Sequence, residues 1–448
     1  MALSRIKTLL IFAGDVIIYY LSLAISLYLR QIFGQSRDFD NFFKIHIQPF
    51  SIILIIWLLV FYLANLYNPQ SFKNGFNLYK VFGISVLVSG ALSAIAFYLF
   101  PFFGITPKTN LFIFILVFGI LGFFWRYFFN LLNNKIGTPE NVILIAPERQ
   151  SSAEQELVQY LKNNPQLGYK IMLRLSENAL ENGKGTLAEL ISKEKISLIV
   201  FPPLLENKEK TVKAIFNSLS VGVQTMGLCD FYELILKKAP LSELEESWFL
   251  ENITQKHQIY DGIKRGLETI SAFILIIVLS PLLLLIFLLI KLTSRGPAIL
   301  NQSRVGKNKV CFSFYKFRSM RQTSPQGLLD QNSAVMTPIG KILRKTHLDE
   351  LPQLFNILRG DLSFIGPRPD LLDYYKDLKD KINFYETRTI IKPGITGWAQ
   401  VSYPITITLE QTAERLAYDL FYLKNRSFML DLVILIRTIR TIFTASGF

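Results

Sequence analysis

The stretch from Arg344 to Gly360 places acidic and basic side chains close together in the chain. It contains two adjacent carboxylates, Asp349 and Glu350, shortly after the arginine. The apolar residues that follow have the i, i+3, i+4, i+7 spacing of a helix, which the glycine would end. Because proline is tolerated only near the start of a helix, Pro352 places both carboxylates at the helix N-terminus. Partial positive charge at that end favours an anionic ligand.

Two interpretations of Asp349 compete. In the structural one, Asp349 caps the helix and Glu350 complements the helix charge. In the functional one, surrounding cations lower the pKa values of the two acids, so that at least one stays ionised as a nucleophile or metal ligand. Adjacent residues on a helix point in different directions, so we expect two distinct roles rather than a face-to-face pair of carboxylates.

A strongly basic segment lies upstream of these acids. Residues 291–329 contain no acidic side chain, and their basic residues are Lys291, Arg295, Arg304, Lys307, Lys309, Lys316, Arg318 and Arg321. We expect this segment to bind phosphate, on a lipid headgroup or on a substrate; a solvated flank is the alternative. Aromatic and basic residues alternate over 314–318 as in a strand, which would place Lys316 and Arg318 on one face to clamp a diphosphate.

Arg368 lies between two prolines, Pro367 and Pro369. Flanking prolines fix the backbone and would preorganise the guanidinium as a phosphate ligand at little entropic cost. Further on, residues 392–400 form a loop rich in turn-forming residues. This loop could shape a pocket, although a plain turn explains it nearly as well.

The composition limits the class of protein that carries these residues. The chain has 448 residues, of which 50% are hydrophobic and 18% charged, and 48 lysines and arginines face 34 acids. These values exclude intrinsic disorder, and the positive excess predicts an anionic partner: nucleic acid, a phosphorylated substrate or acidic lipid. Two distant cysteines and three scattered histidines argue against a disulfide framework or a zinc centre.

Apolar runs fill the first 130 residues, at 8–29, 47–66, 81–100 and 111–129. Each approaches the ~20 residues that cross a bilayer, so residues 1–136 are predicted to form a four-helix transmembrane bundle. With a cytoplasmic N-terminus, six loop cations, Arg126 among them, face four on the other side, which is a weak positive-inside signal. Asp15 lies inside the first run, and we expect a helix–helix contact there rather than a proton relay.

Residues 137–255 have the pattern of a Rossmann-like α/β domain. Strand-like runs at 141–145, 169–173, 196–201 and 221–228 alternate with helix-like runs at 152–163, 186–195 and 209–219. This alternation predicts a parallel sheet of βαβ units. The turn after the first strand, residues 146–150, lacks the glycines of a dinucleotide site, so we expect a structural or regulatory role.

A second apolar element occupies residues 270–290, which carry no charge. Pro281 at its midpoint should kink the helix, and the Ser280 hydroxyl could satisfy a freed backbone group. A full span would put the following residues on the opposite side of the membrane from the α/β domain, whereas a re-entrant helix would keep both on one side; hydropathy does not decide this. Residues 428–443 suit either a helix in the headgroup plane or a helix packed on the soluble core.

Several motifs in residues 260–448 resemble, in order, those of the bacterial sugar transferase family. The motifs are residues 304–308, 315–320, 348–353, 366–369 and 392–398. Members of this family are monotopic phosphoglycosyl transferases that start glycan or polysaccharide assembly on a polyprenyl phosphate. The upstream bundle and α/β domain are similar to those of the large subgroup, and the C-terminal tail is similar to members from exopolysaccharide systems.

The resemblance implies a mainly α-helical catalytic domain over residues 256–448, with residues 270–290 as a re-entrant helix broken at Ser280-Pro281. It also implies a two-step reaction. Asp349 would attack the β-phosphorus of a nucleoside diphosphate sugar, such as a UDP-sugar, and polyprenyl phosphate would then take the phosphosugar. The resemblance places the protein in the bacterial inner membrane, with its catalytic domain on the cytoplasmic face.

The resemblance further implies roles for individual residues. Mg²⁺ would offset the diphosphate charge, with Asp349 as a ligand and Glu350 as either a metal ligand or a proton acceptor. The residues expected to hold phosphate or line the site are Arg344, Arg368, Lys316, Arg318 and Arg304. The expected partners are the nucleotide sugar, polyprenyl phosphate and membrane lipids, with no nucleic acid, and a homo-oligomer is compatible with the resemblance.

Two other functions compete with this interpretation. The sizeable part before residue 260 would suit a catalytically silent membrane scaffold that regulates polysaccharide export. A transporter is disfavoured, because only the first 130 residues are polytopic and they lack a charged path.

Overall fold

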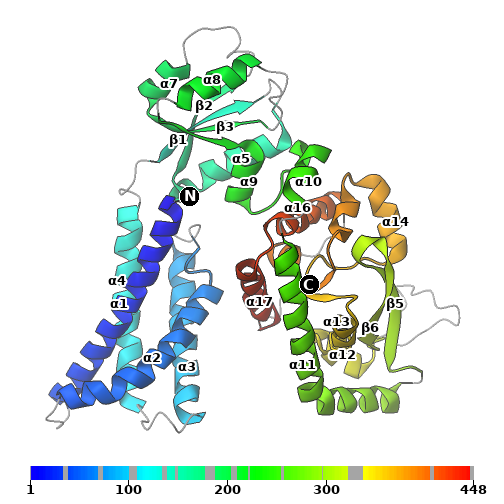
Figure 1. The fold of residues 1–448 in the computed structure, drawn as a ribbon. Coiled ribbons are helices and arrows are strands. Elements are labelled where there is room, and N and C mark those ends of the chain that lie inside the picture. The colour runs from blue at the N-terminus through cyan, green and yellow to red at the C-terminus, as the bar shows by residue number, and fades with distance from the viewer. Residues whose placement is uncertain are drawn as a thin grey trace. The chain divides into compact units, whose positions relative to one another are not determined.

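A computed structural model describes most of the chain (Figure 1). The described ranges are residues 2–33, 39–68, 74–99, 108–133, 139–146, 150–176, 187–202, 209–219, 222–253, 257–294, 296–320, 336–403 and 408–443. The chain divides into two compact units, residues 1–228 and 229–448.

The first unit begins with long apolar helices. They are α1 (Ala2–Phe33), α2 (Phe39–Leu63), α3 (Phe76–Leu99) and α4 (Lys108–Asn133). All four are long and apolar enough to cross a membrane, as the sequence predicts. Aromatic rings fill the space between them: the Trp57 ring makes edge contacts with Tyr19, Phe114 and Phe118. Large rings packed edge to face account for much of the contact between these helices.

Asp15 of α1 and Arg126 of α4 form a buried ion pair inside this bundle. Arg126 Nη1 lies 2.8 Å from Asp15 Oδ1, and Nη2 lies 2.7 Å from Oδ2. The guanidinium also lies 4.5 Å from the centre of the Phe82 ring. The predicted helix–helix contact at Asp15 is therefore confirmed. The assignment of Arg126 to a loop flank is wrong, because the bundle buries it to pair the acid.

A parallel four-stranded sheet completes the first unit. Its strands are β1 (Glu140–Ala146), β2 (Tyr169–Ser176), β3 (Ile196–Phe201) and β4 (Gln224–Gly227), in the order β2-β1-β3-β4. The accompanying helices are α5 (Ser152–Asn163), α7 (Leu187–Glu194) and α8 (Glu209–Leu219). Ile143 and Ile145 of β1 share a core with Ile191 of α7 and Ile215 of α8. The predicted βαβ alternation is confirmed, while residues 147–149 of the glycine-free turn lie outside the described residues.

The second unit combines helices with two small sheets. Its main elements are α9 (Leu228–Leu236), α10 (Glu246–Ile253), α11 (Gln258–Thr293), β5 (Ile299–Val305), β6 (Cys311–Phe317), α12 (Pro338–Lys345), the 3₁₀ turn η6 (Leu348–Glu350), α13 (Gln353–Arg359), β7 (Ser363–Ile365), α14 (Leu372–Lys381), the 3₁₀ turn η7 (Tyr385–Thr389), β8 (Gly394–Thr396), α15 (Trp398–Ser402), α16 (Leu409–Asn425) and α17 (Phe428–Phe443). Strands β5 and β6 form an antiparallel hairpin, and β7 pairs with β8 in parallel. Trp248 of α10 packs in this unit with Tyr385 and Leu420, and the division of the chain at residue 255 remains a prediction.

Helix α11 is apolar enough to cross a membrane, but it changes direction along its length (Figure 1). Its first half packs on α13 through Ala272, whereas its second half packs on α12 through Ile286 and Ile290. Pro281 lies between the two halves, and a proline inside a helix removes a backbone donor and causes a kink. Ser280 Oγ donates a 2.7 Å hydrogen bond to the Ile277 carbonyl in the turn before the proline.

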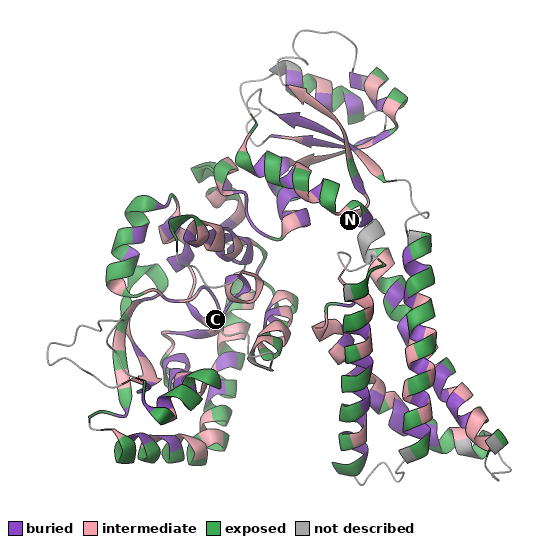
Figure 2. Cartoon of the chain, turned by 180° about the vertical axis from the view of Figure 1, so that it is seen from behind, coloured by how far each residue is buried: buried purple, intermediate pink, exposed green. Residues whose placement is uncertain are grey.

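Much of α11 is exposed although it is apolar (Figure 2). Helix α17 is similar: Ile434 faces the core, while Met429, Leu432 and Ile439 are exposed. Both helices therefore pack one side on the unit and present apolar side chains outward, as helices in contact with lipid do.

Candidate active site

The two adjacent carboxylates lie in a tight turn rather than at a helix cap. Asp349 and Glu350 belong to the 3₁₀ turn η6. His347, the residue before this turn, has the left-handed backbone conformation, with φ 54°. The next helix, α13, has Pro352 as its N-cap and no side-chain cap, so the interpretation of Asp349 as an N-cap is wrong. The predicted end of the helix is confirmed, because Gly360 adopts φ 94°, which favours glycine.

Asp349 is nearly buried, with 9% of its surface exposed. Among the described residues it makes no ion pair within 4 Å. Burial raises the pKa of Asp349, and the neighbouring Glu350 raises it further, while Arg344 and Lys316 act in the opposite direction. The expectation that the basic setting lowers this pKa is therefore wrong, because the loss of solvation outweighs the nearby cations.

Glu350 is paired with Arg368 from the loop after β7. Arg368 Nη2 lies 3.1 Å from Glu350 Oε1, and both side chains are partly exposed. The loop of Arg368 is held in place by backbone bonds: Gly366 N donates to Thr396 O, and Gly394 N donates to Pro367 O, each at 2.9 Å. The β7–β8 pair therefore brings the Arg368 side chain to the acidic turn.

The hairpin β5–β6 adds two cations. The pKa of Lys316 is lowered by burial and by the positive charges of Arg304 and Arg344. Arg304 Nη1 donates a 2.5 Å hydrogen bond to Pro369 O, and its guanidinium lies 4.4 Å from the centre of the Phe314 ring. Burial and Arg368 lower the pKa of Arg304 to about 10. Arg304 thus supports the loop of Arg368, and the structure places Lys316, Arg304 and Arg344 around the same acids.

Arg318 lies just beyond β6 and is buried. Its guanidinium packs against the backbone of Gly296, at a point where a Cβ atom would lie only 2.3 Å from Arg318 Nη1. Gly296 has φ 117°, so a side chain there would be strained as well as crowded. Two other cations of the basic segment, Arg295 and Arg321, lie outside the described residues.

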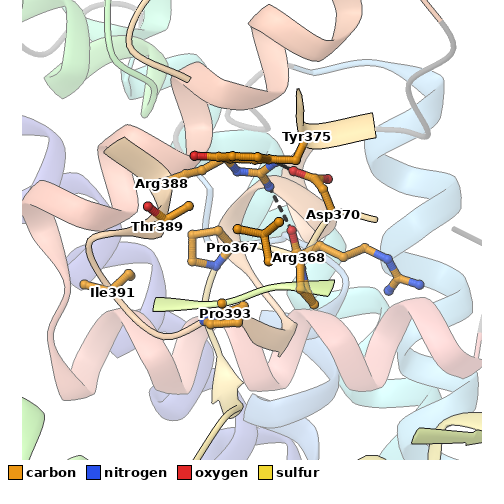
Figure 3. Close-up of a pocket in the computed structure, with 11 residues that line it drawn as sticks. Pro367, Arg368, Asp370, Tyr375, Arg388, Thr389, Ile391 and Pro393 are labelled. Carbon is orange, nitrogen blue, oxygen red and sulfur yellow. Dashed lines mark hydrogen bonds and ion pairs between the residues drawn. The ribbon is translucent and has the colours of Figure 1, made fainter. Parts of the chain in front are cut away.

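Behind the loop of Arg368 lies a buried arginine that sequence reasoning missed. Arg388 pairs with Asp370, and its Nη2 lies 2.9 Å from Asp419 Oδ2. The same nitrogen donates a 3.0 Å hydrogen bond to the carbonyl of Arg368, as Figure 3 shows. Arg388 therefore fixes the backbone of Arg368 from behind. These partners lie on two separate elements, the loop after β7 and α16, so no local motif points to Arg388.

The pocket in Figure 3 lies on the inner side of this loop. Pro367, Asp370, Arg388 and Pro393 line it, and the Arg368 side chain extends away from it. The pocket opens to solvent, and the space inside it is about 230 Å³. Ligand pockets usually measure roughly 300–1,000 Å³, so this pocket is too small for a nucleotide sugar. The contact between the Arg368 side chain and Glu350 lies outside this pocket.

A second buried network ties β7 to α11 and α17. Lys264 Nζ donates to Ile365 O at 3.0 Å and to the Tyr422 hydroxyl at 2.8 Å. The same hydroxyl donates to Asp431 Oδ1 at 2.7 Å, and Asp431 pairs with Lys264 at 3.0 Å. Glu268 accepts hydrogen bonds from the Ser363 hydroxyl and the Phe364 amide. The strand that leads to Arg368 is therefore held by charges on the apolar helix itself.

The described residues contain no group of three side chains able to hold a metal ion. Asp349 and Glu350 are nevertheless two adjacent carboxylates at the centre of the site. Mg²⁺ is commonly held by one or two carboxylates together with substrate phosphates. These residues therefore fit a Mg²⁺ ion that is shared with a bound diphosphate.

Comparison with known proteins finds a family match over the second unit. Residues 259–445 match the bacterial sugar transferase family. An Aeromonas hydrophila protein, UDP-N-acetylgalactosamine-undecaprenyl-phosphate N-acetylgalactosaminephosphotransferase, is 44% identical over 192 residues, which are 42% of this chain and 45% of that protein. This chain thus spans less than half the length of that relative.

Two further relatives share one name, UDP-glucose:undecaprenyl-phosphate glucose-1-phosphate transferase. The Caulobacter vibrioides protein is 40% identical over 192 residues, which cover 41% of this chain and 71% of the relative. The Escherichia coli protein is 28% identical over 319 residues, which cover 67% of each chain. The longer match extends beyond the second unit into the α/β region.

Proposed function

Because this chain belongs to the bacterial sugar transferase family, we propose that it transfers a sugar-1-phosphate from a UDP-sugar to undecaprenyl phosphate. The relatives described above are named for these two substrates. The product would be an undecaprenyl diphosphate sugar, on which assembly of an exopolysaccharide or another glycan could begin. The observation that carries the proposal is Asp349, a nearly buried carboxylate without an ion pair among the described residues, beside the cations Arg344 and Lys316.

In the first step, a carboxylate oxygen of Asp349 attacks the β-phosphorus of the UDP-sugar. A new P–O bond to the enzyme forms, the bond to the bridging oxygen breaks, and UMP leaves with that oxygen. Transfer of a phosphoryl group spreads negative charge over its oxygens, which preorganised cations stabilise. Lys316, Arg344 and Arg368 supply these cations around the acidic turn.

In the second step, an oxygen of undecaprenyl phosphate attacks the same phosphorus. The P–O bond to Asp349 breaks, and the carboxylate is regenerated as the diphosphate lipid forms. Glu350 holds Arg368 toward the site through their 3.1 Å ion pair. When bound, Mg²⁺ would neutralise part of the diphosphate charge, with Asp349 and Glu350 as the residues able to hold it.

We also propose that α11 is a re-entrant membrane helix and that the second unit is monotopic. The apolar run turns near Pro281, and both halves pack on the same unit, which suits a helix that enters and leaves one leaflet. The catalytic unit would then lie on the cytoplasmic face of the inner membrane. The undecaprenyl phosphate headgroup would meet the site at the depth of the interface.

This topology can be tested by thiol labelling in sealed membrane vesicles. Cys311 is exposed and Cys229 is buried, so the native chain reports the second unit. Exposed positions Lys162 and Asp40, each changed to Cys in a Cys311→Ser background, report the α/β region and the opposite side of α1. A re-entrant α11 predicts that Cys311 reacts from the same side as position 162. Labelling of Cys311 from the side of position 40 would show a full span.

The α/β region supports a further part of the proposal. Its order β2-β1-β3-β4 is that of an open doubly wound sheet, so we propose that it is Rossmann-like. Its first turn lacks glycine, so it would act structurally or in regulation rather than in dinucleotide binding.

The activity can be tested by trapping the covalent intermediate. Purified protein is incubated with a panel of UDP-sugars in the absence of lipid and analysed by intact-protein mass spectrometry and peptide mapping. We expect the mass of a sugar phosphate to appear on Asp349 and UMP to be released. Asp349→Asn should show neither, while Asp380→Asn, at a 76% exposed side chain, should match the native protein. An adduct on another residue would refute the nucleophile. In a parallel incubation with undecaprenyl phosphate, no labelled lipid with any UDP-sugar would favour the scaffold function.

A further inference from the structure

Arg415 of α16 is a half-buried arginine whose guanidinium is only partly satisfied by the described residues. Its Nε and Nη2 atoms are both buried and make no hydrogen bond. Among the described residues it makes no ion pair within 4 Å, although Asp419 lies one helical turn further along α16. Asp419 pairs with Arg388 instead.

The neighbours of Arg415 are residues that support or form the loop of Arg368, which reaches the candidate active site. Burial and the positive charges of Arg388 and Arg368 lower the pKa of Arg415, and the lowering prevails although Asp419 and Asp370 act in the opposite direction. The charge of Arg415 in turn contributes to lowering the pKa of Arg304. The guanidinium therefore lies close to the arginines that hold and form the loop after β7.

The charges of this region do not balance. Its cations are Arg304, Lys316, Arg344, Arg368, Arg388 and Arg415, and its acids are Asp349, Glu350, Asp370 and Asp419. Two positive charges are left over, and a nucleoside diphosphate sugar carries one negative charge on each of its phosphates. Burying a charge without a partner is costly, whereas a guanidinium can bind a phosphate through two parallel hydrogen bonds.

We infer that Arg415 is a ligand for a substrate phosphate group in the reaction proposed above. The phosphate belongs either to the UDP-sugar or to undecaprenyl phosphate, and the chemistry of recognition is the same. The inference rests on the proposed function. It also predicts a phosphate-binding site that a binding measurement can detect without catalysis.

The two half-reactions distinguish the two phosphates. Adduct formation with the UDP-sugar alone reports the donor, and transfer from the preformed adduct to undecaprenyl phosphate reports the acceptor. Loss of a charged hydrogen bond predicts that Arg415→Met slows one of these steps by about 10- to 100-fold. Arg415→Lys keeps the charge but not the planar fork, so it should recover only part of the rate. Rates within about twofold of the native protein in both steps would overturn the inference.

A binding measurement separates this role from a structural one. Without ligand, Arg415→Met should melt at the same temperature as the native protein or higher, because it removes an unpaired buried charge. Arg388→Met is the matched control: it leaves Asp370 and Asp419 without their partner and should melt lower. Inorganic pyrophosphate should raise the melting temperature of the native protein and much less that of Arg415→Met. Equal shifts would overturn the inference, whereas a native protein that binds pyrophosphate but forms no adduct would refute only the proposed function.

Discussion

The N-terminal helical bundle and the second unit both bury charge, but the buried acids have different partners in the two regions. In the bundle, Asp15 and Arg126 face each other through two contacts of 2.7 and 2.8 Å. In the second unit, Asp349 makes no ion pair within the described part of the chain, and its pKa is raised by burial and by Glu350. The bundle pairs its buried carboxylate with an arginine, whereas the second unit leaves the carboxylate of Asp349 without an ion pair among the described residues.

The difference is the one expected between a structural ion pair and the proposed active site. A buried acid that meets an arginine one to one has nothing left to offer a ligand, and its removal affects folding alone. A buried carboxylate that forms no ion pair with the nearby cations remains available to attack phosphorus as a nucleophile. The raised pKa of Asp349 is thus compatible with catalysis, provided that the acid is ionised when the donor binds.

The largest expected effect follows from changing each acid to its amide. Asp349→Asn should reduce turnover by at least about 1,000-fold, as expected for loss of a nucleophile. Its melting temperature should stay equal or rise, because a carboxylate whose folded pKa is raised opposes folding at neutral pH. Asp15→Asn should show the reverse, with normal turnover per folded molecule and reduced stability. Turnover and thermal unfolding in detergent measure both; similar effects from the two variants would contradict the comparison.

The ion pair of the bundle offers a second test. Arg126→Leu leaves Asp15 buried without its partner and should cost about 3–5 kcal/mol of unfolding free energy. The double variant, with leucine at both positions, removes both charges and should recover most of that loss. Unfolding titrations in mixed micelles would measure this recovery. A double variant as unstable as the sum of the singles would show that the two residues are not coupled, and it would contradict the buried ion pair.

Local patterns predicted the elements and part of the site. The strands and helices of the α/β region follow the predicted alternation, and the helix ends at Gly360 as its type predicts. Glu350 and Arg368 meet although they are 18 residues apart, because both belong to compact motifs separated by one helix and one strand. Predictions of this kind succeed where a few neighbouring residues decide the outcome.

The remaining features depend on contacts between distant elements. Arg388 gathers acids from the segment after β7 and from α16, and a sequence does not show which carboxylates will surround an arginine. The direction of the Asp349 pKa was mispredicted for the same reason: neighbouring cations are visible in the sequence, but burial is not. Whether α17 lies in the headgroup plane or packs on the core likewise depends on which of its faces the rest of the unit covers, and the sequence does not show this.

The cations beside Asp349 predict a shift in pH dependence. Lys316 helps to keep the pKa of Asp349 down, so Lys316→Met should raise that pKa further. Attack needs the ionised carboxylate, so the rate of adduct formation rises as pH passes upward through this pKa. The acid limb of the profile should therefore move to higher pH in the variant. Lys309→Met, at an exposed residue near the same hairpin, is the control, and equal profiles for the two variants would exclude Lys316 from the site.

The smallest expected effect tests the network that holds β7. Tyr422→Phe removes a hydroxyl that accepts from Lys264 and donates to Asp431, while the 3.0 Å pair between those two residues remains. Because the charges stay paired, the loss should be about 1 kcal/mol, or about 2–4 °C in the melting of a unit of this size. Tyr374→Phe, at an exposed hydroxyl, should change nothing measurable. A loss as large as that of Arg126→Leu would mean that the hydroxyl, not the ion pair, anchors the strand that carries Arg368.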